Sequence, residues 1–284
     1  MKRLHVLFSI FVVSGLILSA CAQAAPPNPE GCLGTAADAI VDLDCREVTI
    51  AVENAYVPYN YIDADTGEAG GWDYDVWDEI CTRLHCAPVY VEAAWEGMIQ
   101  AVADGQFDAA ADGITITAER DEIVDFSLGY IAIEQRLLVR IDETRIESME
   151  DIVADESLVL GTQTGTTNYE TALQHLPADR IQAFEQFPFA VQALIAGDVD
   201  AVIIDETAGQ GYLGENADAL KLVGPSLSSD LLGFIYPNGS DLVAPVDQAL
   251  QSMIDDGTLA EFNLFYFGEG FTPPENLGEG AYGD

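Results

Sequence analysis

Short apolar runs alternate with amphipathic segments along the first half of the chain. Val76, Ile80 and Leu84 fall on one face of a predicted helix, whereas the run that ends at Val52 has the length of a strand. The predicted elements, in order, are a strand over 47–52, a turn or hairpin over 61–71, a helix over 75–84, a strand over 89–92, a helix over 95–103 and a strand over 107–111. This alternation favours a parallel sheet covered by helices on both faces.

The second half repeats the alternation after an extended stretch over 135–140. Its predicted elements are a strand over 158–161, helices over 168–175 and 188–196, a strand over 200–204, a helix from residue 206, a strand over 231–236, and helices over 241–255 and 259–267. Two α/β units joined by extended segments predict two lobes with a cleft between them.

The extended segments set the expected domain boundaries. The first lobe is predicted to comprise 47–131 together with 230–270, and the second lobe 132–229. The hinges are expected near 131–134 and 229–232, where few backbone torsions would change. A flexible tail rich in Gly and Pro is predicted over 271–284.

The amino terminus has the layout of an export signal. Lys2 and Arg3 precede an apolar run over 6–18, which is shorter than the roughly 20 residues that span a bilayer, so 1–20 is predicted to be a signal peptide. The sequence Leu-Ser-Ala-Cys that ends at Cys21 resembles a bacterial lipobox, which implies acylation of Cys21 after cleavage. Ordinary cleavage beside a spare cysteine is the alternative. With lipidation, 21–46 is a tether that holds an exported protein on the outer face of the cell membrane, or in the periplasm.

Composition excludes several classes of protein. The chain of 284 residues is 49% hydrophobic, which suffices for packed cores and excludes disorder throughout. Its net charge of −39 repels phosphate backbones, so nucleic acid is excluded as a partner. A dense carboxylate surface stays hydrated at high salt, which suggests a saline habitat, although lineage composition would give the same count.

Four cysteines follow Cys21. An even number in an exported chain predicts two disulfides, and sequence proximity favours Cys32–Cys45 and Cys81–Cys86. The alternative, a four-cysteine zinc site, lacks paired C-x-x-C knuckles. We therefore expect no metal and no cofactor.

Several motifs together resemble one known family. The segment 71–77 reads Gly-Trp-Asp-Tyr-Asp-Val-Trp, and 95–101 reads Trp-Glu-Gly-Met-Ile-Gln-Ala. The longest match, 107–120, reads Phe-Asp-Ala-Ala-Ala-Asp-Gly-Ile-Thr-Ile-Thr-Ala-Glu-Arg and is followed by Val-Asp-Phe-Ser at 124–127. Weaker matches lie at 165–167, 198–205 and 256–258. Over about 47–268 the chain is similar to family 3 extracellular solute-binding proteins, the polar amino-acid receptors of ABC importers.

The resemblance implies a periplasmic-binding-protein-like fold with two lobes, each a mainly parallel sheet flanked by helices. It also implies a monomer without enzymatic activity that takes a small amino acid to a membrane ABC permease. The Cys81 and Cys86 pair resembles a disulfide of basic amino-acid receptors in the family, with a shorter spacing.

The matching positions suit a zwitterionic ligand. The Arg120 guanidinium fits a carboxylate bidentately, and the resemblance places it on the ligand's α-carboxylate; the alternative is a surface ion pair with a neighbouring acid. Thr115 adds a hydroxyl, and Gly113 leaves room for its backbone to approach the ligand. From the second lobe, the N–H groups of Thr166, Thr167 and Asn168 are expected to meet the carboxylate at a helix start.

Asp205 follows a buried strand, where ligands of α/β sheets bind. The resemblance pairs it with the α-ammonium; a helix N-cap is a compatible role.

Five further positions define the side-chain pocket. The resemblance makes Tyr56 and Trp95 an aromatic pair around the ligand, although either side chain could be core. Glu53 and Asp112 supply two carboxylates, and Asp112 departs from the small residue usual in the family. Two such acids repel each other unless a cation lies between them, so arginine, lysine or ornithine is the expected ligand. Gln163 keeps glutamine and other polar amino acids open as alternatives.

Two other classes of function share the expected fold. Some relatives are dehydratases that act on prephenate or arogenate with an acidic proton donor, but the chain has no Ser-His-Asp set and no phosphate-binding glycine motif. A domain that presents amino acids to a sensor is the second alternative.

Overall fold

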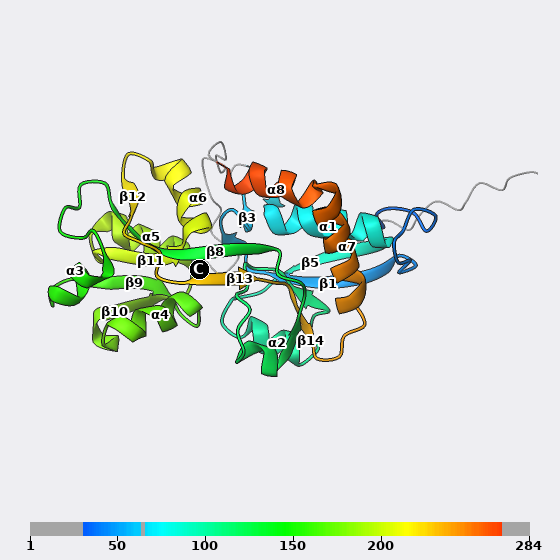
Figure 1. Cartoon of the computed structure of the whole chain (residues 1–284), viewed down its shortest axis with the longest axis horizontal. Coiled ribbons are helices and arrows are strands. Elements are labelled where there is room, and N and C mark those ends of the chain that lie inside the picture. The colour runs from blue at the N-terminus through cyan, green and yellow to red at the C-terminus, as the bar shows by residue number, and fades with distance from the viewer. Residues whose placement is uncertain (1–30, 64–65, 269–284) are drawn as a thin grey trace, which may run out of the picture.

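The computed structural model describes residues 31–63 and 66–268, and it shows two lobes, each built on its own sheet (Figure 1). The predicted signal peptide over 1–20, the lipidation site Cys21 and the predicted tail over 271–284 lie outside the described residues. None of the helices in the described part has both the length and the apolar character needed to cross a bilayer. The predicted two-lobed α/β architecture is confirmed.

The first lobe has a five-stranded sheet in which a single strand is reversed. In spatial order the strands are β5 (Cys86–Glu92), β1 (Arg46–Val52), β6 (Ala109–Ala110), β14 (Ile235–Pro237) and β7 (Val124–Phe126). β14 is antiparallel to both of its neighbours, and the other four strands run the same way. A small antiparallel sheet of β2 (Ala55–Tyr56), β3 (Asn60–Ile62) and β4 (Ala69–Gly70) lies beside it.

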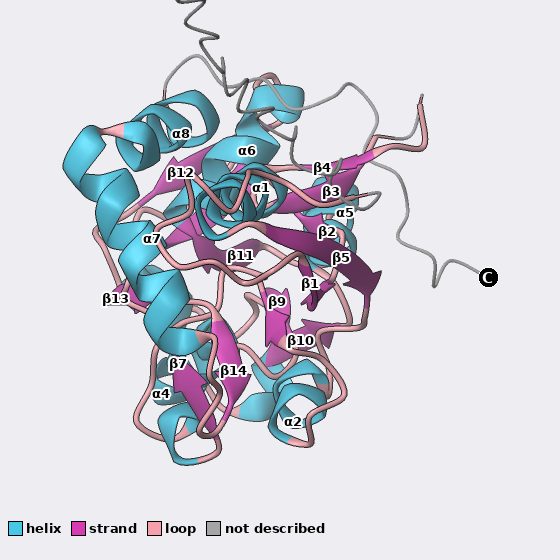
Figure 2. Cartoon of the chain, turned by 90° about the vertical axis from the view of Figure 1, so that its right-hand side faces the viewer, coloured by secondary structure: helices cyan, strands magenta, loops and turns pink. Residues whose placement is uncertain are grey.

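Helices cover both faces of the first sheet, as the alternation of β1 requires (Figure 2). Ile50 and Val52 pack on the side of α1 (Trp72–Leu84) and α7 (Val243–Asp256). A third helix, α8 (Thr258–Phe267), contacts both of these helices. The intervening Ala51 packs on the other side against α2 (Met98–Ala103).

The second lobe follows the same plan. Its strands in spatial order are β10 (Ile181–Phe184), β9 (Leu160–Gln163), β11 (Ala201–Asp205), β8 (Ile131–Arg140) and β12 (Leu220–Val223), with β13 (Ser229–Leu232) also paired to β8. Its helices are α3 (Met149–Ala154), α4 (Thr167–His175), α5 (Phe187–Ala196) and α6 (Glu206–Asn216). Two 3₁₀ turns complete the fold, η1 (Arg120–Glu122) in the first lobe and η2 (Ala178–Arg180) in the second. β8 is antiparallel to all of its neighbours and is the reversed strand of this lobe.

The two reversed strands are those that the chain enters directly after it crosses between the lobes. β8 carries the chain into the second lobe, and β13 followed by β14 carries it back (Figure 1). β8 and β13 pair antiparallel, with Glu134 opposite Ser229 and Ile131 opposite Leu232. The two crossing segments therefore form one hydrogen-bonded ribbon.

The single strand predicted over 231–236 is wrong. The chain leaves the ribbon at Leu232 and starts a strand of a different sheet at Ile235. A Cβ at Gly233 would lie 3.1 Å from Cδ1 of Ile116, so the glycine lets the chain pass close to this side chain between the two strands. The continuous apolar run misled the prediction, since periodicity does not report a change of sheet.

The predicted ends of other elements differ from those in the structure, and one of these differences affects the site. The helix predicted over 95–103 begins only at Met98, which leaves Trp95 in the loop before it. The helix predicted from 75 begins at Trp72, whose side chain is fully buried. The pattern did not indicate β7, α3, β10 or β12, which are short elements with few buried positions.

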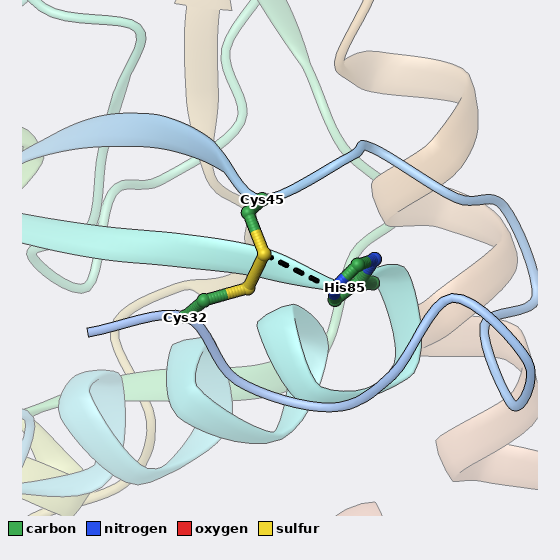
Figure 3. Close-up of side chains that lie close together, drawn as sticks. All are labelled: Cys32, Cys45 and His85. Atoms are coloured by element: carbon green, nitrogen blue, oxygen red, sulfur yellow. Dashed lines mark hydrogen bonds between the residues drawn. A yellow bond between two sulfur atoms is a disulfide. The ribbon is translucent and has the colours of Figure 1, made fainter. Parts of the chain in front are cut away.

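Residues 31–45 of the predicted tether are attached to the first lobe. The N–H of Leu33 donates to the carbonyl oxygen of Cys86, and the N–H of Cys45 donates to that of His85. Both expected disulfides are present, Cys32–Cys45 and the buried Cys81–Cys86. Nε2 of His85 lies 3.0 Å from Sγ of Cys45 (Figure 3). Because both sulfurs of the first pair are in the disulfide, this group offers no thiolate to a metal.

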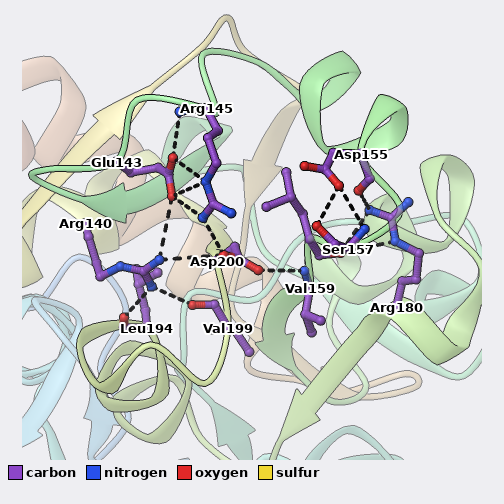
Figure 4. Close-up of polar contacts among 11 residues, drawn as sticks. Arg140, Glu143, Arg145, Asp155, Ser157, Val159, Arg180, Leu194, Val199 and Asp200 are labelled. Atoms are coloured by element: carbon purple, nitrogen blue, oxygen red, sulfur yellow. Dashed lines mark hydrogen bonds and ion pairs between the residues drawn. The ribbon is translucent and has the colours of Figure 1, made fainter.

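A polar network at the far end of the second sheet fixes β8 to the start of β11 (Figure 4). Nη1 of Arg140 donates to two backbone carbonyl oxygens, one in α5 and one just beyond it. Nη2 of Arg145 lies 2.6 Å from Glu143 and 2.7 Å from Asp200. The network holds the start of β11, whereas the end of that strand faces the cleft.

Candidate ligand-binding site

All residues predicted to bind ligand line one pocket between the lobes. The first lobe supplies Glu53, Tyr56, Trp95, Asp112, Gly113, Thr115 and Arg120, and the second supplies Gln163, Thr166, Thr167, Asn168, Phe187 and Asp205. Four of them stand at the ends of strands: Glu53 and Asp112 lie just after β1 and β6, and Gln163 and Asp205 end β9 and β11. The carboxyl ends of parallel strands meet at one sheet edge, and two such edges face each other here.

Arg120 is held by the first lobe and points into the pocket. Nη1 donates to the carbonyl oxygen of Thr115 at 2.9 Å, and the guanidinium carbon lies 5.3 Å from the ring centre of Trp95. Burial lowers the pKa of the guanidinium from its ordinary value. Among the described residues no carboxylate pairs with Arg120 within 4.0 Å, so the alternative surface ion pair is not formed. The remaining guanidinium donors are placed to meet a carboxylate.

Gly113 lines the pocket and also makes room for Tyr56. Its φ is +58°, and a Cβ there would lie 2.6 Å from Cε1 of Tyr56. A side chain at this position would therefore displace the Tyr56 ring. Tyr56 also stacks on Tyr59, with ring centres 5.2 Å apart, and on Phe187, with ring centres 5.3 Å apart. Phe187 was missed because its only sequence signal was an aromatic residue before a helix-starting proline.

The start of α4 presents backbone donors to the pocket, as predicted. Thr166 is the N-cap, and its hydroxyl accepts from the N–H of Tyr169 at 3.1 Å and donates to the carbonyl oxygen of Gln163 at 2.8 Å. The N–H groups of Thr167 and Asn168, in the first turn, have no acceptor within the helix. They are available to a carboxylate.

Asp205 stands at the N-cap position of α6, yet its side chain makes no capping hydrogen bond. Its carboxylate instead accepts from Tyr56 Oη at 2.5 Å and from Asn168 Nδ2 at 3.0 Å. Burial raises the pKa of Asp205 to about 6, and the hydrogen bonds from Tyr56 and Asn168 oppose the increase. Near pH 6 the ligand-free protein therefore holds Asp205 partly in its neutral form, and an approaching cation favours the ionised form.

Glu53 and Asp112 form a buried acidic pair, 2% and 3% exposed. Glu53 Oε1 accepts from Gln163 Nε2 at 2.9 Å, and Asp112 Oδ1 accepts from Asn60 Nδ2 at 2.7 Å. Burial raises the pKa of both groups, and the charge of Asp112 raises that of Glu53 further. Asn60 was not predicted as part of the site, because a polar residue in a hairpin carries no signal of what its amide will reach.

Direct hydrogen bonds connect the lobes across the pocket. Besides Tyr56 with Asp205 and Glu53 with Gln163, the hydroxyls of Thr115 and Thr167 lie 3.3 Å apart. The cavity among these side chains measures about 20 Å³, which holds about one water molecule. An amino acid can enter only when the lobes separate.

Comparison with known proteins identifies the family. The profile of "Bacterial extracellular solute-binding proteins, family 3" matches residues 48–269. The chain belongs to this family. The L-cystine-binding protein TcyA of Bacillus subtilis is 28% identical to this solute-binding protein over 224 residues, which cover 78% of this chain and 81% of the relative. The glutamate-binding protein GluB of Corynebacterium efficiens is 27% identical, with 99% of this chain and 95% of the relative covered.

Solved structures share the fold. An ancestral arginine-binding protein bound to glutamine has a TM-score of 0.73 and 29% identity, covering 78% of this solute-binding protein and 98% of the ancestral chain. ArtJ of Geobacillus stearothermophilus, an arginine-, lysine- and histidine-binding protein, has a TM-score of 0.73 and 28% identity, covering 79% and 96%. The ancestral amino-acid-binding protein AncCDT-1, a precursor of cyclohexadienyl dehydratase, has a TM-score of 0.72 and 30% identity, covering 78% and 95%.

Proposed function

We propose that this solute-binding protein is an extracytoplasmic receptor for a cationic L-amino acid: arginine, lysine or ornithine. In this proposal the ligand is enclosed between lobe 1 (47–131 with 230–270) and lobe 2 (132–229), which close about the β8–β13 ribbon. The protein acts as a monomer, anchored through Cys21, and delivers its ligand to an ABC permease. Relatives that bind arginine support the ligand class.

The observation that carries the proposal is the division of charge within one pocket. Arg120 and the first N–H groups of α4 suit an α-carboxylate, and Asp205 suits an α-ammonium. Beyond these groups lie Glu53 and Asp112, two buried carboxyls with no basic side chain within 4.0 Å among the described residues. A cationic side chain would supply the charge that this end of the pocket lacks.

Glutamine is the alternative ligand, because the Gln163 amide already meets Glu53 and could turn to meet a ligand amide. The protein is first unfolded and refolded to remove any carried-over ligand. Isothermal titration calorimetry then separates these possibilities with a panel of arginine, lysine, ornithine, glutamine, glutamate and cystine. We expect binding of at least one cationic amino acid in the micromolar range or tighter. If glutamine binds and arginine, lysine and ornithine do not, the cationic ligand is rejected. If none of the six amino acids binds, an amino-acid ligand is rejected altogether.

A dehydratase is the second candidate, favoured by the likeness to AncCDT-1 and by the buried acidic pair. Incubation with prephenate and detection of phenylpyruvate tests it. We expect no turnover, since the pocket is bounded by groups that hold a zwitterion and lies closed until the lobes separate.

A further inference from the structure

Glu53 and Asp112 are joined through the backbone as well as by proximity. The N–H of Glu53 donates to the Asp112 carboxylate, and the N–H of Trp95 donates to the Glu53 carboxylate. These contacts come from fixed main-chain positions directly after β1 and before α2. Neither carboxyl can therefore turn away from the other without losing a hydrogen bond.

A third buried acid lies behind the pair. Asn60 Nδ2 bridges Asp112 Oδ1, at 2.7 Å, and Asp73 Oδ2, at 2.9 Å, while Asn60 Oδ1 accepts from the N–H of Asn54 at 2.6 Å. Asp73 is fully buried, and burial raises its pKa. Because Asn60 is bonded on both sides, it fixes the orientation of Asp112 toward Glu53.

The surroundings do not neutralise this charge. The titratable groups around the pair are of two kinds. The charge of Asp112 acts on Tyr56, Asp73, Tyr74 and Tyr130, and the cleft around Glu53 is also lined by Glu96, Arg120, Glu185 and Asp205. Glu92 accepts a hydrogen bond from the neighbouring Asn54. Arg120 is the sole base of this set, and it is held over Trp95. Two ionised carboxylates side by side in such a site repel each other and lack solvation, so the ligand-free pair retains a proton near pH 6.

We infer that a cationic ligand displaces this proton, so that binding of arginine, lysine or ornithine releases about one proton from the Glu53–Asp112 pair to solvent. The inference rests on the proposed function, and it extends that function by making affinity for cations dependent on pH. The reaction is an exchange: the ligand's ammonium or guanidinium takes the place of a carboxyl proton, and no bond other than that O–H bond breaks.

The sign of the pH dependence follows from linkage. A ligand that releases one proton binds about tenfold more tightly for each pH unit of increase. This holds between the pKa of the pair in the complex and the raised pKa of the ligand-free pair, and the affinity levels off above the latter because the pair is then ionised before the ligand arrives. A neutral amino acid of the same shape displaces no proton from this pair. Its α-ammonium ionises Asp205, whose pKa burial raises to about 6, as the α-ammonium of arginine also does, so the slope that comes from the pair is the difference between the two ligands.

Isothermal titration with L-arginine and with L-citrulline, its uncharged analogue, provides the test. The titrations are run near pH 6, where a carboxyl with a raised pKa still holds its proton. The binding enthalpies observed in phosphate and in imidazole buffer then differ in proportion to the number of protons released, because only imidazole has a large enthalpy of ionisation. We expect arginine to release about one proton more than citrulline, because both ligands ionise Asp205 through the α-ammonium and only arginine brings a cation to the pair. A second series from about pH 5 to about pH 9 gives the slope.

Glu53→Gln should reduce the proton count of arginine binding to about that of citrulline and flatten the additional pH slope of arginine. The control Glu47→Gln removes an exposed carboxyl at the opposite end of β1 from Glu53 and should leave both unchanged. Should Glu53→Gln not fold, the difference between the wild-type proton counts for arginine and citrulline decides alone. Equal proton counts and equal pH slopes for arginine and citrulline overturn the inference but leave the proposed function standing. Absence of binding by all three cationic amino acids overturns the proposed function itself.

Discussion

The hydroxyl of Tyr56 in the first lobe donates a 2.5 Å hydrogen bond to Oδ2 of Asp205 in the second. Nearby, Tyr59 and Thr207 bring their hydroxyls within 2.9 Å across the same interface. The side chain that we propose for the ligand's ammonium thus also holds the lobes together. In the ligand-free protein these bonds hold the lobes closed, so their strength sets how readily the lobes open to admit a ligand.

Tyr56→Phe should shift the ligand-free protein toward an open form. The substitution removes the bond to Asp205 but keeps the ring stacked on Tyr59 and Phe187. One such hydrogen bond contributes about 1 kcal/mol, which is about a fivefold change in the ratio of open to closed forms. Small-angle X-ray scattering should show a larger radius of gyration. Tyr90→Phe, which removes a 2.8 Å bond to Asp78 within the first lobe, should not change it.

Arg120→Ala should abolish amino-acid binding while the protein stays folded. The substitution removes the pocket's carboxylate partner, and loss of one member of a buried charge pair costs about 2–5 kcal/mol of binding free energy. Titration calorimetry measures the loss, and circular dichroism checks the fold. Arg46→Ala removes a surface ion pair with Asp241 at the end of β1 that lies away from the pocket, and this variant should bind the amino acid normally. Unchanged affinity in Arg120→Ala would show that the site is misplaced.

Asp205 should make the ligand-free protein less stable as pH rises. Its pKa is raised from 3.8 to about 6 by burial, so the folded state holds this proton more tightly than the unfolded state. The resulting loss of stability develops between these two values and amounts to at most about 3 kcal/mol. Asp205→Asn has no titrating group at this position. As pH rises over that interval, the free energy of unfolding of the variant, measured by urea titration, should therefore increase relative to that of the wild type. Parallel pH profiles for the two proteins would contradict the assignment.

Glu143 should have the opposite effect. Its hydrogen bonds with Arg145, together with the Arg145 charge, lower the pKa of Glu143 from 4.5 to about 2 (Figure 4). Its stabilisation is present above the unfolded value and is lost as pH falls toward about 2. Because Arg145 is half exposed, we expect Glu143→Gln to cost about 1 kcal/mol at neutral pH. The cost should vanish in acid, whereas Glu147→Gln, an exposed acid nearby, should cost little at any pH.

High salt should stabilise the protein. With 49 acidic against 10 basic residues, the folded surface repels itself at low ionic strength. Raising the salt from about 0.01 M to about 1 M shortens the screening length from about 30 Å to about 3 Å and reduces this repulsion. Differential scanning calorimetry should show an unfolding midpoint that rises with salt. A midpoint that does not change with salt would argue against a saline habitat and favour the general composition of the lineage as the origin of the acidity.

The sequence located most of the pocket because its residues stand at the ends of buried strands and in spaced motifs. Asp205 was placed by the strand before it, and Arg120 by the long motif over 107–120. The sequence did not indicate Phe187 or Asn60, whose roles depend on which side chains lie opposite them. It also joined β13 to β14, since an apolar run does not reveal that its halves belong to different sheets.

Lipidation of Cys21 and the choice of amino acid stay predictions. The first falls outside the described residues, and the second depends on the ionisation of Glu53 and Asp112 when a ligand arrives.

Periodicity and local motifs determined the two α/β units, the cysteine pairs and the chemical types around the cleft, because each depends on neighbours within about one element of the chain. Only the tertiary structure decided that Glu53 and Asp112 share one buried space with no basic side chain of the described residues within 4.0 Å, and that Tyr56 closes on Asp205. Burial and charge balance depend on residues distant in sequence, and these meet only when both sheets turn their strand ends toward the same cleft.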